Sequence, residues 1–327
     1  MKSLTIVVPN GENNLSSITG SFEIFSKAEL YWQVTGKKQL FHIQLAGVSE
    51  QIDFSAGLFS VRPHTNISKI SETDLIIVPS LNHNYELAMK DNQQLVLWLH
   101  EKYKAGAEIA TICTGTFLLA ASGLLDGKTC STHWAVAEQF RSRFPKVNLQ
   151  TDRLITDEKG LYTNGGAYSF LNLILYLVEK YYDRETAIYC SKVFQIEISR
   201  NTQSEFKIFS GQKTHDDEII SHAQHYIENN VEVKITIEDL SSKFNIGRRN
   251  FDRRFIKATG NTPLEYAQRV KIETAKKSFE TTQKTVNEVM YQVGYNDVKA
   301  FREVFRKYTG LSPLEYKGKY NKDGMVF

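Results

Sequence analysis

One cysteine stands where a strand gives way to a helix. EIATIC, from Glu108 to Cys113, has the pattern of a short buried strand, and TG follows before a new helix begins at Thr116. A tight turn at this place, a nucleophile elbow, exposes one side chain above a sheet and directs the next backbone N–H groups toward an anion. The chemistry that this pattern allows is therefore nucleophilic attack by the Cys113 thiol. The alternative is a small buried cysteine that only packs.

A cysteine nucleophile needs a partner, because a thiol with a pKa of about 8.5 is mostly protonated at neutral pH. His133 is the one nearby candidate base, and no acidic residue is visible in the sequence to orient it. We therefore expect His133 to pack or to orient a ligand. Cys113 and His133 together are interpreted as the remnant of a catalytic elbow.

A second group of chemically active residues lies near the C-terminus in RRNFDRR, Arg248 to Arg254. Phe251 and Phe255 are four residues apart, so on a helix they share one face, which leaves the guanidinium groups on the others. Arginine can pair with guanine and a carboxylate with cytosine in the major groove, and further basic side chains hold phosphate. This face therefore predicts a DNA-reading helix.

The chain also repeats itself. FIKATGNTPLEY, starting at Phe255, returns as FRKYTGLSPLEY, starting at Phe305, with eight of twelve letters identical. In each copy a glycine suits the left-handed end of a helix, and T-P-L-E or S-P-L-E then caps the start of the next. Upstream, Thr236 and Thr285 have the pattern of two further N-caps, each at the start of a short helix. Upstream matches at spacings of 49 and 50 predict two helix-turn-helix units, the second with one more residue in its turn. A long helix from 263 to 279 should join them, with Leu264, Ala267, Val270 and Ala275 available for packing.

Composition indicates two domains. The 327 residues exceed what one small core needs. From Lys234 onward the chain has 19 Lys and Arg against 11 Asp and Glu, a net charge of +8, which leaves the rest near −5. A basic C-terminal third is typical of a nucleic-acid-binding module. A plain helical repeat that binds another protein is the alternative, and the double turn and the arginine cluster argue against it.

Other features exclude several classes of protein. The three cysteines have no paired spacing, so we expect no structural metal site, no disulfide and no cofactor. The N-terminal apolar run is about five residues long, too short for a signal peptide or a membrane span, and this predicts a cytoplasmic protein.

The first two hundred residues alternate short apolar runs with amphipathic stretches. This alternation predicts an α/β domain with a mostly parallel sheet covered on both faces. Strands are expected at 4–8, 41–48, 74–79 and 108–113, and helices at 85–104, at 164–182 and from there to about residue 200. We place this domain at 1–200, a linker at 201–216 and an all-helical domain at 217–320.

The C-terminal motifs resemble the AraC/XylS family of bacterial transcription regulators. The resemblance rests on VMYQVGYNDVKAFREVFRKYTGLSPLEY, which starts at Val289, and DLSSKFNIGRRNFDRRFIKATGNTPLEY, which starts at Asp239. It implies seven helices, with two helix-turn-helix units that place recognition helices in successive major grooves of a double-stranded DNA operator. The residues expected to read bases or hold phosphate are Arg248, Arg249, Asn250, Asp252, Arg253, Lys299, Arg302, Glu303 and Arg306. RRNFDRR and VKAFREV differ, which predicts two unlike half-sites.

The N-terminal stretch TICTGTFLLAASGLLDGKTCSTHW, from Thr111, resembles the PfpI/ThiJ group of the class I glutamine amidotransferase-like superfamily. The order of the two domains resembles GlxA-type regulators, which implies a flavodoxin-like doubly wound fold. Two positions depart from the enzymes of that superfamily: Thr114 stands where peptidase-like members have His, and Ser17 stands where hydratase-like members have Asp. We therefore interpret the domain as a degenerate enzyme reused to sense a small-molecule effector, such as an amino acid or a quaternary amine.

Doubly wound sheets bind ligands at the carboxyl ends of their strands, so the effector pocket is expected there. The candidate pocket residues are Asn10, Gly11, Cys113, Thr114, His133, Gly165, Gly166 and Tyr168. The sequence thus predicts a ligand-responsive regulator, homodimeric through its N-terminal domain. Two alternatives stay open: a cysteine-dependent hydrolase or hydratase fused to a DNA-binding domain, and a constitutive regulator whose pocket is filled by its own side chains.

Overall fold

The computed structural model describes residues 1–82, 84–198, 203–213 and 215–321. The chain separates into two compact units, Met1–Gln203 and Ser204–Phe327. The division falls inside the stretch 201–216 that the sequence suggested as a linker. Of that stretch, residues 201, 202 and 214 lie outside the described residues, as do residues 199 and 200 of the first predicted domain.

The first unit is built on a seven-stranded sheet with the order β10-β11-β7-β6-β1-β2-β5. All neighbours are parallel except β10, which is antiparallel to β11. The mostly parallel, flavodoxin-like sheet predicted from the sequence is therefore confirmed. Its strands are β1 (Lys2–Val8), β2 (Phe41–Gly47), β5 (Thr65–Asn66), β6 (Leu75–Val78), β7 (Glu108–Thr111), β10 (Ile155–Glu158) and β11 (Leu161–Asn164).

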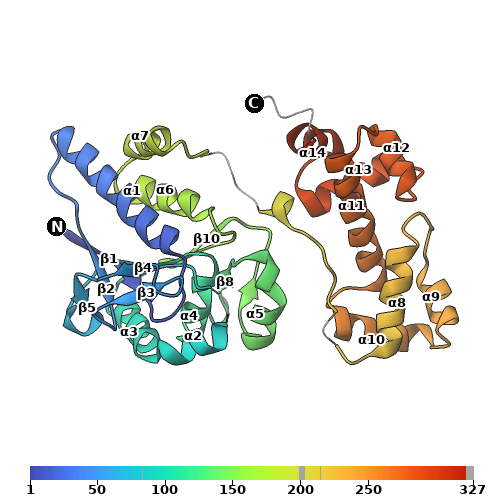
Figure 1. The fold of residues 1–327 in the computed structure, drawn as a ribbon, viewed down its shortest axis with the longest axis horizontal. Helices are drawn as coiled ribbons and strands as arrows, with labels where there is room; N and C mark the ends of the chain where they lie inside the picture. Colours follow the sequence, from blue (N-terminus) through green and yellow to red (C-terminus); the bar gives the residue numbers. More distant parts are fainter. Residues whose placement is uncertain (83, 199–202, 214, 322–327) are drawn as a thin grey trace. The chain divides into compact units, whose positions relative to one another are not determined.

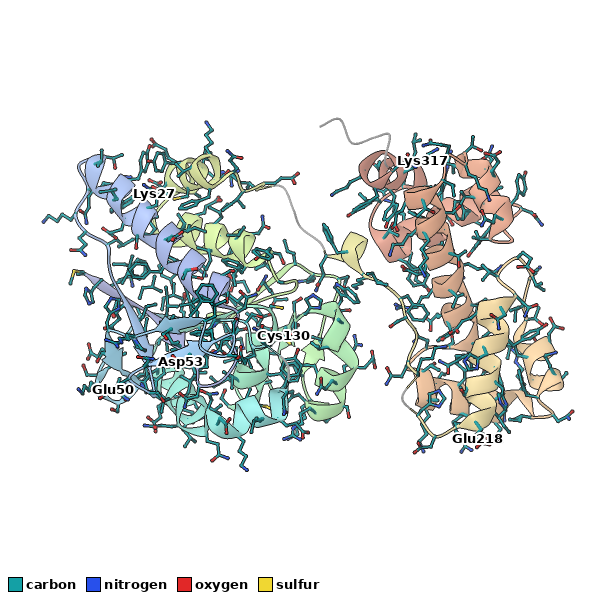
Figure 2. All side chains as sticks on the ribbon, viewed as in Figure 1. Lys27, Glu50, Asp53, Cys130, Glu218 and Lys317 are labelled. Carbon is teal, nitrogen blue, oxygen red and sulfur yellow. The ribbon has the colours of Figure 1, made fainter. Side chains whose placement is uncertain are left out.

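Helices cover both faces of this sheet, as Figures 1 and 2 show. One face packs against α1 (Leu15–Val34), α6 (Phe170–Tyr181) and α7 (Arg184–Phe194), and the other against α2 (Tyr85–Asp91), α3 (Gln93–Lys104), α4 (Thr116–Ala121) and α5 (Ala137–Arg143). Each face has its own apolar core. Such burial on both sides explains why the central strands read as continuous apolar runs rather than alternating ones.

Two helix predictions need correction. The stretch 85–104 forms two helices, α2 and α3, because the chain breaks at Asn92. The Asn92 side chain accepts a hydrogen bond from the Asn10 N–H at 2.8 Å and donates one to the Asn10 carbonyl at 3.0 Å. The helix expected from residue 164 begins only at Phe170, because residues up to Asn164 form β11.

Short strands escaped prediction. They are β3 (Ile52–Phe54) paired with β4 (Phe59–Val61), β8 (Thr129–Cys130) paired with β9 (Asn148–Leu149), and β5, β10 and β11 of the main sheet. Segments of two to four residues are too short to establish a period of two. Cys130 of β8 is buried, and it is labelled in Figure 2.

The second unit contains seven α-helices among its described residues, as the resemblance implied. They are α8 (Glu218–Asn229), α9 (Ile237–Lys243), α10 (Arg248–Thr259), α11 (Pro263–Thr281), α12 (Val286–Gln292), α13 (Val298–Thr309) and α14 (Pro313–Tyr320). Two separate apolar clusters lie at the two ends of α11, one with α8 to α10 and one with α12 to α14. We call the first group of helices, α8 to α10, unit A and the second, α12 to α14, unit B.

The caps and turns predicted from the repeat are confirmed. Capping boxes begin α9, α11, α12 and α14, and the left-handed glycines Gly260 and Gly310 end α10 and α13. The turn before α10 spans residues 244–247 and the turn before α13 spans 293–297, one residue more. One packing prediction is wrong: Leu264 is half exposed, because it falls on the outer face of α11.

Candidate nucleic-acid interface and sensor pocket

Helix α10 buries one aromatic face and presents a basic one. Phe251 and Phe255 are fully buried in the core of unit A. Arg248, Arg249, Asn250 and Arg253 are exposed, and Asp252 is half-buried. The predicted sorting of phenylalanines inward and guanidinium groups outward therefore follows from the helical period.

The exposed side chains of α10 are held differently from one another. Arg248 forms a close ion pair with Glu238 of α9, and Arg253 donates to the Asn250 side chain at 3.1 Å. The structure shows no ion pair for Arg249 among the described residues. Arg249 is thus the guanidinium of this helix that is most available to a partner.

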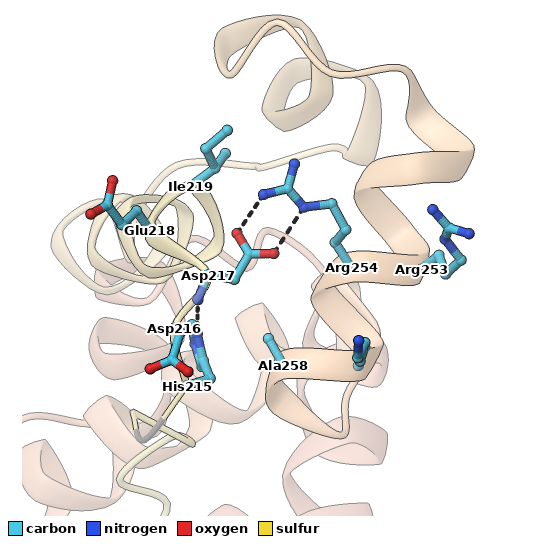
Figure 3. A pocket seen from close by; sticks show the side chains of 9 residues that line it. His215, Asp216, Asp217, Glu218, Ile219, Arg253, Arg254 and Ala258 are labelled. Carbon is cyan, nitrogen blue, oxygen red and sulfur yellow. Dashed lines mark hydrogen bonds and ion pairs between the residues drawn. The ribbon is translucent and has the colours of Figure 1, made fainter.

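Arg254 belongs to the scaffold of unit A. Its guanidinium donates two hydrogen bonds, at 2.8 and 2.7 Å, to the carboxylate of Asp217, the N-cap of α8 (Figure 3). These hydrogen bonds lower the pKa of Asp217. Arg253 points away from this pair in the same view. A paired, partly buried arginine fixes one helix against another and is not free to read a base.

Helix α13 repeats the arrangement with a less occupied polar face. Phe301 and Phe305 are fully buried, whereas Lys299, Arg302, Glu303 and Arg306 are exposed. The helix starts at a side-chain cap, in which Asp297 accepts the Ala300 N–H at 2.6 Å. All nine predicted DNA-contacting residues thus lie on α10 or α13, and eight of them are exposed.

The elbow predicted at Cys113 has a strained backbone. Cys113 has a φ of +53°, a left-handed conformation that is unfavourable for a residue with a Cβ. Its N–H donates to the Asn164 side chain of β11 at 2.9 Å, which holds the turn against the sheet. At Gly115 a Cβ would lie 2.3 Å from the Pro79 carbonyl oxygen, so only glycine fits. The turn therefore has the geometry of a nucleophile elbow.

The thiol itself is in a poor environment for attack. Cys113 is 2% exposed, and its burial raises the pKa of the thiol; hydrogen bonds with Ser80, Thr114 and the Gly166 backbone oppose this only in part. Ser17 donates to the Asn14 carbonyl at 2.7 Å and accepts the Ser80 N–H at 3.2 Å.

His133 does not complete a dyad. Its Nδ1 accepts the Ala135 N–H at 3.1 Å, which caps the short 3-10 helix η3 (Trp134–Val136). Burial lowers the pKa of His133, so the ring is neutral at pH 7. No hydrogen bond joins His133 to Cys113 in the described part of the chain.

The other predicted pocket residues divide into two groups. Gly166 contacts the Cys113 thiol through its backbone, and Thr114 bonds to Ser80 and Leu81, so these residues gather at the elbow together with Gly165. The second group does not share these contacts at the elbow. Asn10 bonds to Asn92 and Ser49, Gly11 is exposed, and Tyr168 is 66% exposed.

One residue beside the elbow was missed by sequence reasoning. Gln203, the last residue of the first unit, is 1% exposed, and its Nε2 donates to the Thr132 carbonyl at 3.0 Å. Thr132 in turn donates to the Cys113 carbonyl at 2.9 Å. Gln203 lies in a polar stretch without periodicity, so no local signal distinguishes it from a linker residue.

The described residues include no helix that is long and apolar enough to cross a bilayer. They also contain no group of three or more His, Cys, Asp or Glu placed to hold a metal ion.

Each of the two parts of the chain matches a known protein family or domain. The DJ-1/PfpI family profile matches residues 6–180, and a helix-turn-helix domain profile matches residues 240–319. The HTH-type transcriptional regulator GbdR of Pseudomonas aeruginosa is 25% identical over 288 residues, which are 86% of this chain and 76% of that protein. The regulator ArgR of the same organism is 25% identical over 222 residues, 68% of this chain and 67% of that protein.

Several solved structures resemble part of this chain. A putative transcriptional regulator from Vibrio parahaemolyticus is 25% identical with a TM-score of 0.53, over 59% of this chain and 98% of that chain. An AraC family transcriptional regulator from Pseudomonas putida is 16% identical with a TM-score of 0.50, over 59% of this chain and 100% of that chain. Drosophila melanogaster DJ-1beta, at 18% identity and a TM-score of 0.50, covers 60% of this chain and 98% of its own length, which shows the shared fold.

The helix-turn-helix match and the regulators similar to this chain define the class of protein: this is a DNA-binding transcriptional regulator with a C-terminal helix-turn-helix domain. The chain belongs to the DJ-1/PfpI family, whose profile covers more than half of it.

Proposed function

We propose that the protein is a ligand-responsive, sequence-specific regulator in which α10 and α13 each enter a major groove of one operator. The observation that carries this proposal is the pair of recognition helices, each with a buried phenylalanine face and an exposed basic face, fixed at the two ends of α11. A helix of this kind fits the major groove, and its N-terminal residues reach base edges.

The two helices carry different readers, so we propose two unlike half-sites. Arg249 and Arg253 on α10 and Lys299 and Arg302 on α13 are suited to guanine, and Glu303 is suited to cytosine. Arg248 and Arg306 are assigned to phosphate, and Asn250 completes the polar face of α10. Asp252 can contact a base only if its side chain turns outward. Its Oδ1 is buried and has no hydrogen-bond partner among the described residues.

The test is operator binding by fluorescence anisotropy, with the operator first selected from random duplex DNA. Arg249→Ala and Arg302→Ala should each weaken binding by about 1–3 kcal/mol and relax one base preference, at different half-sites. Arg141→Ala is the matched control, since it removes a guanidinium paired with Glu138 on α5 of the first unit. Wild-type affinity in both recognition-helix variants would contradict the assignment.

For the first unit we propose a non-catalytic sensor. Three observations support this: the raised pKa of Cys113, the serine at position 17 and the engagement of His133 in a helix cap. The alternative, a cysteine-dependent hydrolase or hydratase, requires a thiolate at neutral pH. Alkylation of Cys113 by iodoacetamide should be no faster than that of a free thiol. Peptide mass spectrometry measures the rate of alkylation. Faster alkylation, together with any turnover that Cys113→Ser abolishes, would favour the enzyme.

We further propose a cytoplasmic homodimer formed through the first unit. The support is the resemblance of the domain arrangement to GlxA-type regulators and the need of a regulator to reach DNA. Light scattering coupled to size-exclusion chromatography should give twice the chain mass of 37.4 kDa. A monomer at micromolar concentration, on or off DNA, would argue against it.

A further inference from the structure

Gln203 fills the site where the sequence predicts the effector. Its amide lies against Gly165, so closely that a Cβ at that position would be 1.9 Å from the Gln203 Nε2. The next residue, Gly166, contacts the Cys113 thiol through its backbone. The Gln203 amide is thus one residue away from the elbow, within the group of predicted pocket residues.

The groups around the Gln203 amide are acceptors. The Nε2 lies 3.0 Å from the Thr132 carbonyl, 3.4 Å from the Ser131 hydroxyl and 3.5 Å from the Arg153 carbonyl. This set suits an N–H-rich group. The other half of the amide is not matched, because the buried Oε1 has no hydrogen-bond partner among the described residues. An unpaired buried carbonyl is unfavourable, so the site suits the nitrogen end of glutamine better than the whole amide.

The same chain shows that backbone carbonyls can accept the hydrogen bonds of a buried ammonium group. The buried Nζ of Lys271 in α11 donates to the carbonyls of Val231, Val233 and Val293 at 2.6, 3.1 and 2.9 Å. The acceptors around Gln203 resemble this arrangement in chemistry. Either a primary ammonium or a primary carboxamide can therefore donate to them.

We propose that Gln203 is a built-in occupant of the effector pocket, and that the effector is a small molecule whose primary ammonium or carboxamide group displaces the Gln203 amide. This rests on the proposed sensor function. Gln203 is followed directly by Ser204, the first residue of the second unit, so displacement frees the chain at the start of the DNA-binding unit. A quaternary amine has no N–H to donate and does not fit this site.

The experiment measures binding of minimal probes to the full-length chain by thermal shift and calorimetry. The probes are propionamide, ethylammonium chloride and, as a cation without N–H groups, tetramethylammonium chloride at equal ionic strength. Gln203→Ala should bind propionamide or ethylammonium saturably at millimolar concentrations, at least tenfold more tightly than wild type, because a tethered side chain competes at millimolar effective concentration. Which of the two probes binds identifies the amide or the amine as the effector class.

Two further variants secure the result. Gln139→Ala removes an exposed glutamine of α5 and should behave as wild type. If Gln203→Ala does not fold, Gln203→Glu carries the test, because a carboxylate is repelled by the carbonyl acceptors and vacates the site.

The proposal is overturned if neither variant binds a probe better than wild type, or if tetramethylammonium binds as well as the N–H probes. Gln203 is then a permanent filler, and a constitutive regulator is favoured. Operator binding distinguishes failure of the Gln203 proposal from failure of the regulator assignment. If Arg249→Ala loses operator affinity but Gln203→Ala gains no probe binding, only the proposal that an effector displaces Gln203 is rejected. Unchanged operator affinity in Arg249→Ala and Arg302→Ala rejects the regulator assignment itself.

Discussion

Units A and B share a scaffold and differ in how their recognition helices are held. Both bury two phenylalanines four residues apart, and both end at a left-handed glycine followed by a capping box. Helix α13 begins at the side-chain cap of Asp297, whereas α10 begins after Gly247 with no side-chain cap. In compensation, α10 is tied to its neighbours by ion pairs from Arg248 to Glu238 and from Arg254 to Asp217.

The difference shows that the residues repeated in both units specify the helix-turn-helix scaffold. The residues that differ between them decide which side chains form internal ion pairs and which stay exposed. Unit A uses part of its basic side chains for its own structure, which leaves fewer of them for DNA. In unit B, Lys299 and Arg302 are exposed and have no ion pair among the described residues. We therefore expect unit A to depend more on its internal ion pairs and unit B to offer the more accessible basic face.

The largest expected effect tests whether units A and B unfold independently of each other. Phe251→Ala or Phe301→Ala should each cost about 3–5 kcal/mol, because each empties the centre of a buried cluster. Hydrogen exchange read by mass spectrometry should show loss of protection in α8 to α10 for the first variant and in α12 to α14 for the second. Equal loss in both units from either change would mean that α11 couples them into one cooperative body.

Lys271 is one contact that joins units A and B, because its ammonium bonds to carbonyls on both sides. Lys271→Met should leave the carbonyls of Val231, Val233 and Val293 without their donor and cost about 1–3 kcal/mol in urea unfolding. The exposed Lys277→Met on the same helix is the control and should stay within about 0.5 kcal/mol of wild type. A neutral Lys271→Met would show that water replaces the ammonium.

The glycine ends of the recognition helices should behave alike. Gly260 and Gly310 have φ values of 68° and 78°, so alanine at either position is placed in the left-handed region. Each Gly→Ala change should cost about 1 kcal/mol, measured by chemical denaturation. A cost confined to one unit would show that the repeated frame is not equivalent in the two places.

The smallest expected effect is a pH dependence of unit A. The Arg254 guanidinium holds the pKa of Asp217 below its ordinary value, so this stabilisation is complete above the unfolded pKa of about 4. It is lost as the pH falls through the lower folded pKa. Asp217→Asn keeps an N-cap but removes the charge, so it should abolish this acid-dependent part of unit A stability while unit B is unaffected. An unchanged acid transition in α8 to α10 would contradict the role of the pair.

Much of the helix-turn-helix scaffold, and the turn at Cys113, could be predicted from local sequence patterns. The capping boxes at Thr236, Thr262, Thr285 and Ser312 follow from residues three apart, and the core phenylalanines follow from the helical period. The elbow at Cys113 was visible as a strand, a small-residue turn and a helix. These features depend on neighbours in sequence, so the sequence is enough to identify them.

The candidate sensor site could be predicted only in part. Cys113, Thr114, Gly165 and Gly166 meet because β7 and β11 are adjacent in the sheet, and that adjacency is set by tertiary pairing. The break at Asn92 likewise depends on a contact with Asn10, 82 residues away. Neither contact leaves a mark in the local sequence.

By itself the sequence determined the two-part organisation and the doubled helix-turn-helix scaffold, because periodicity and caps are local properties. Only the tertiary structure decided that Arg254 bonds to Asp217 while Arg249 has no ion pair among the described residues, and that the Gln203 amide is buried against Gly165 beside the elbow. The reason is physical: burial and hydrogen bonding depend on what surrounds a side chain in space, and a glutamine in a polar stretch carries no sign of the glycines and carbonyls it will meet.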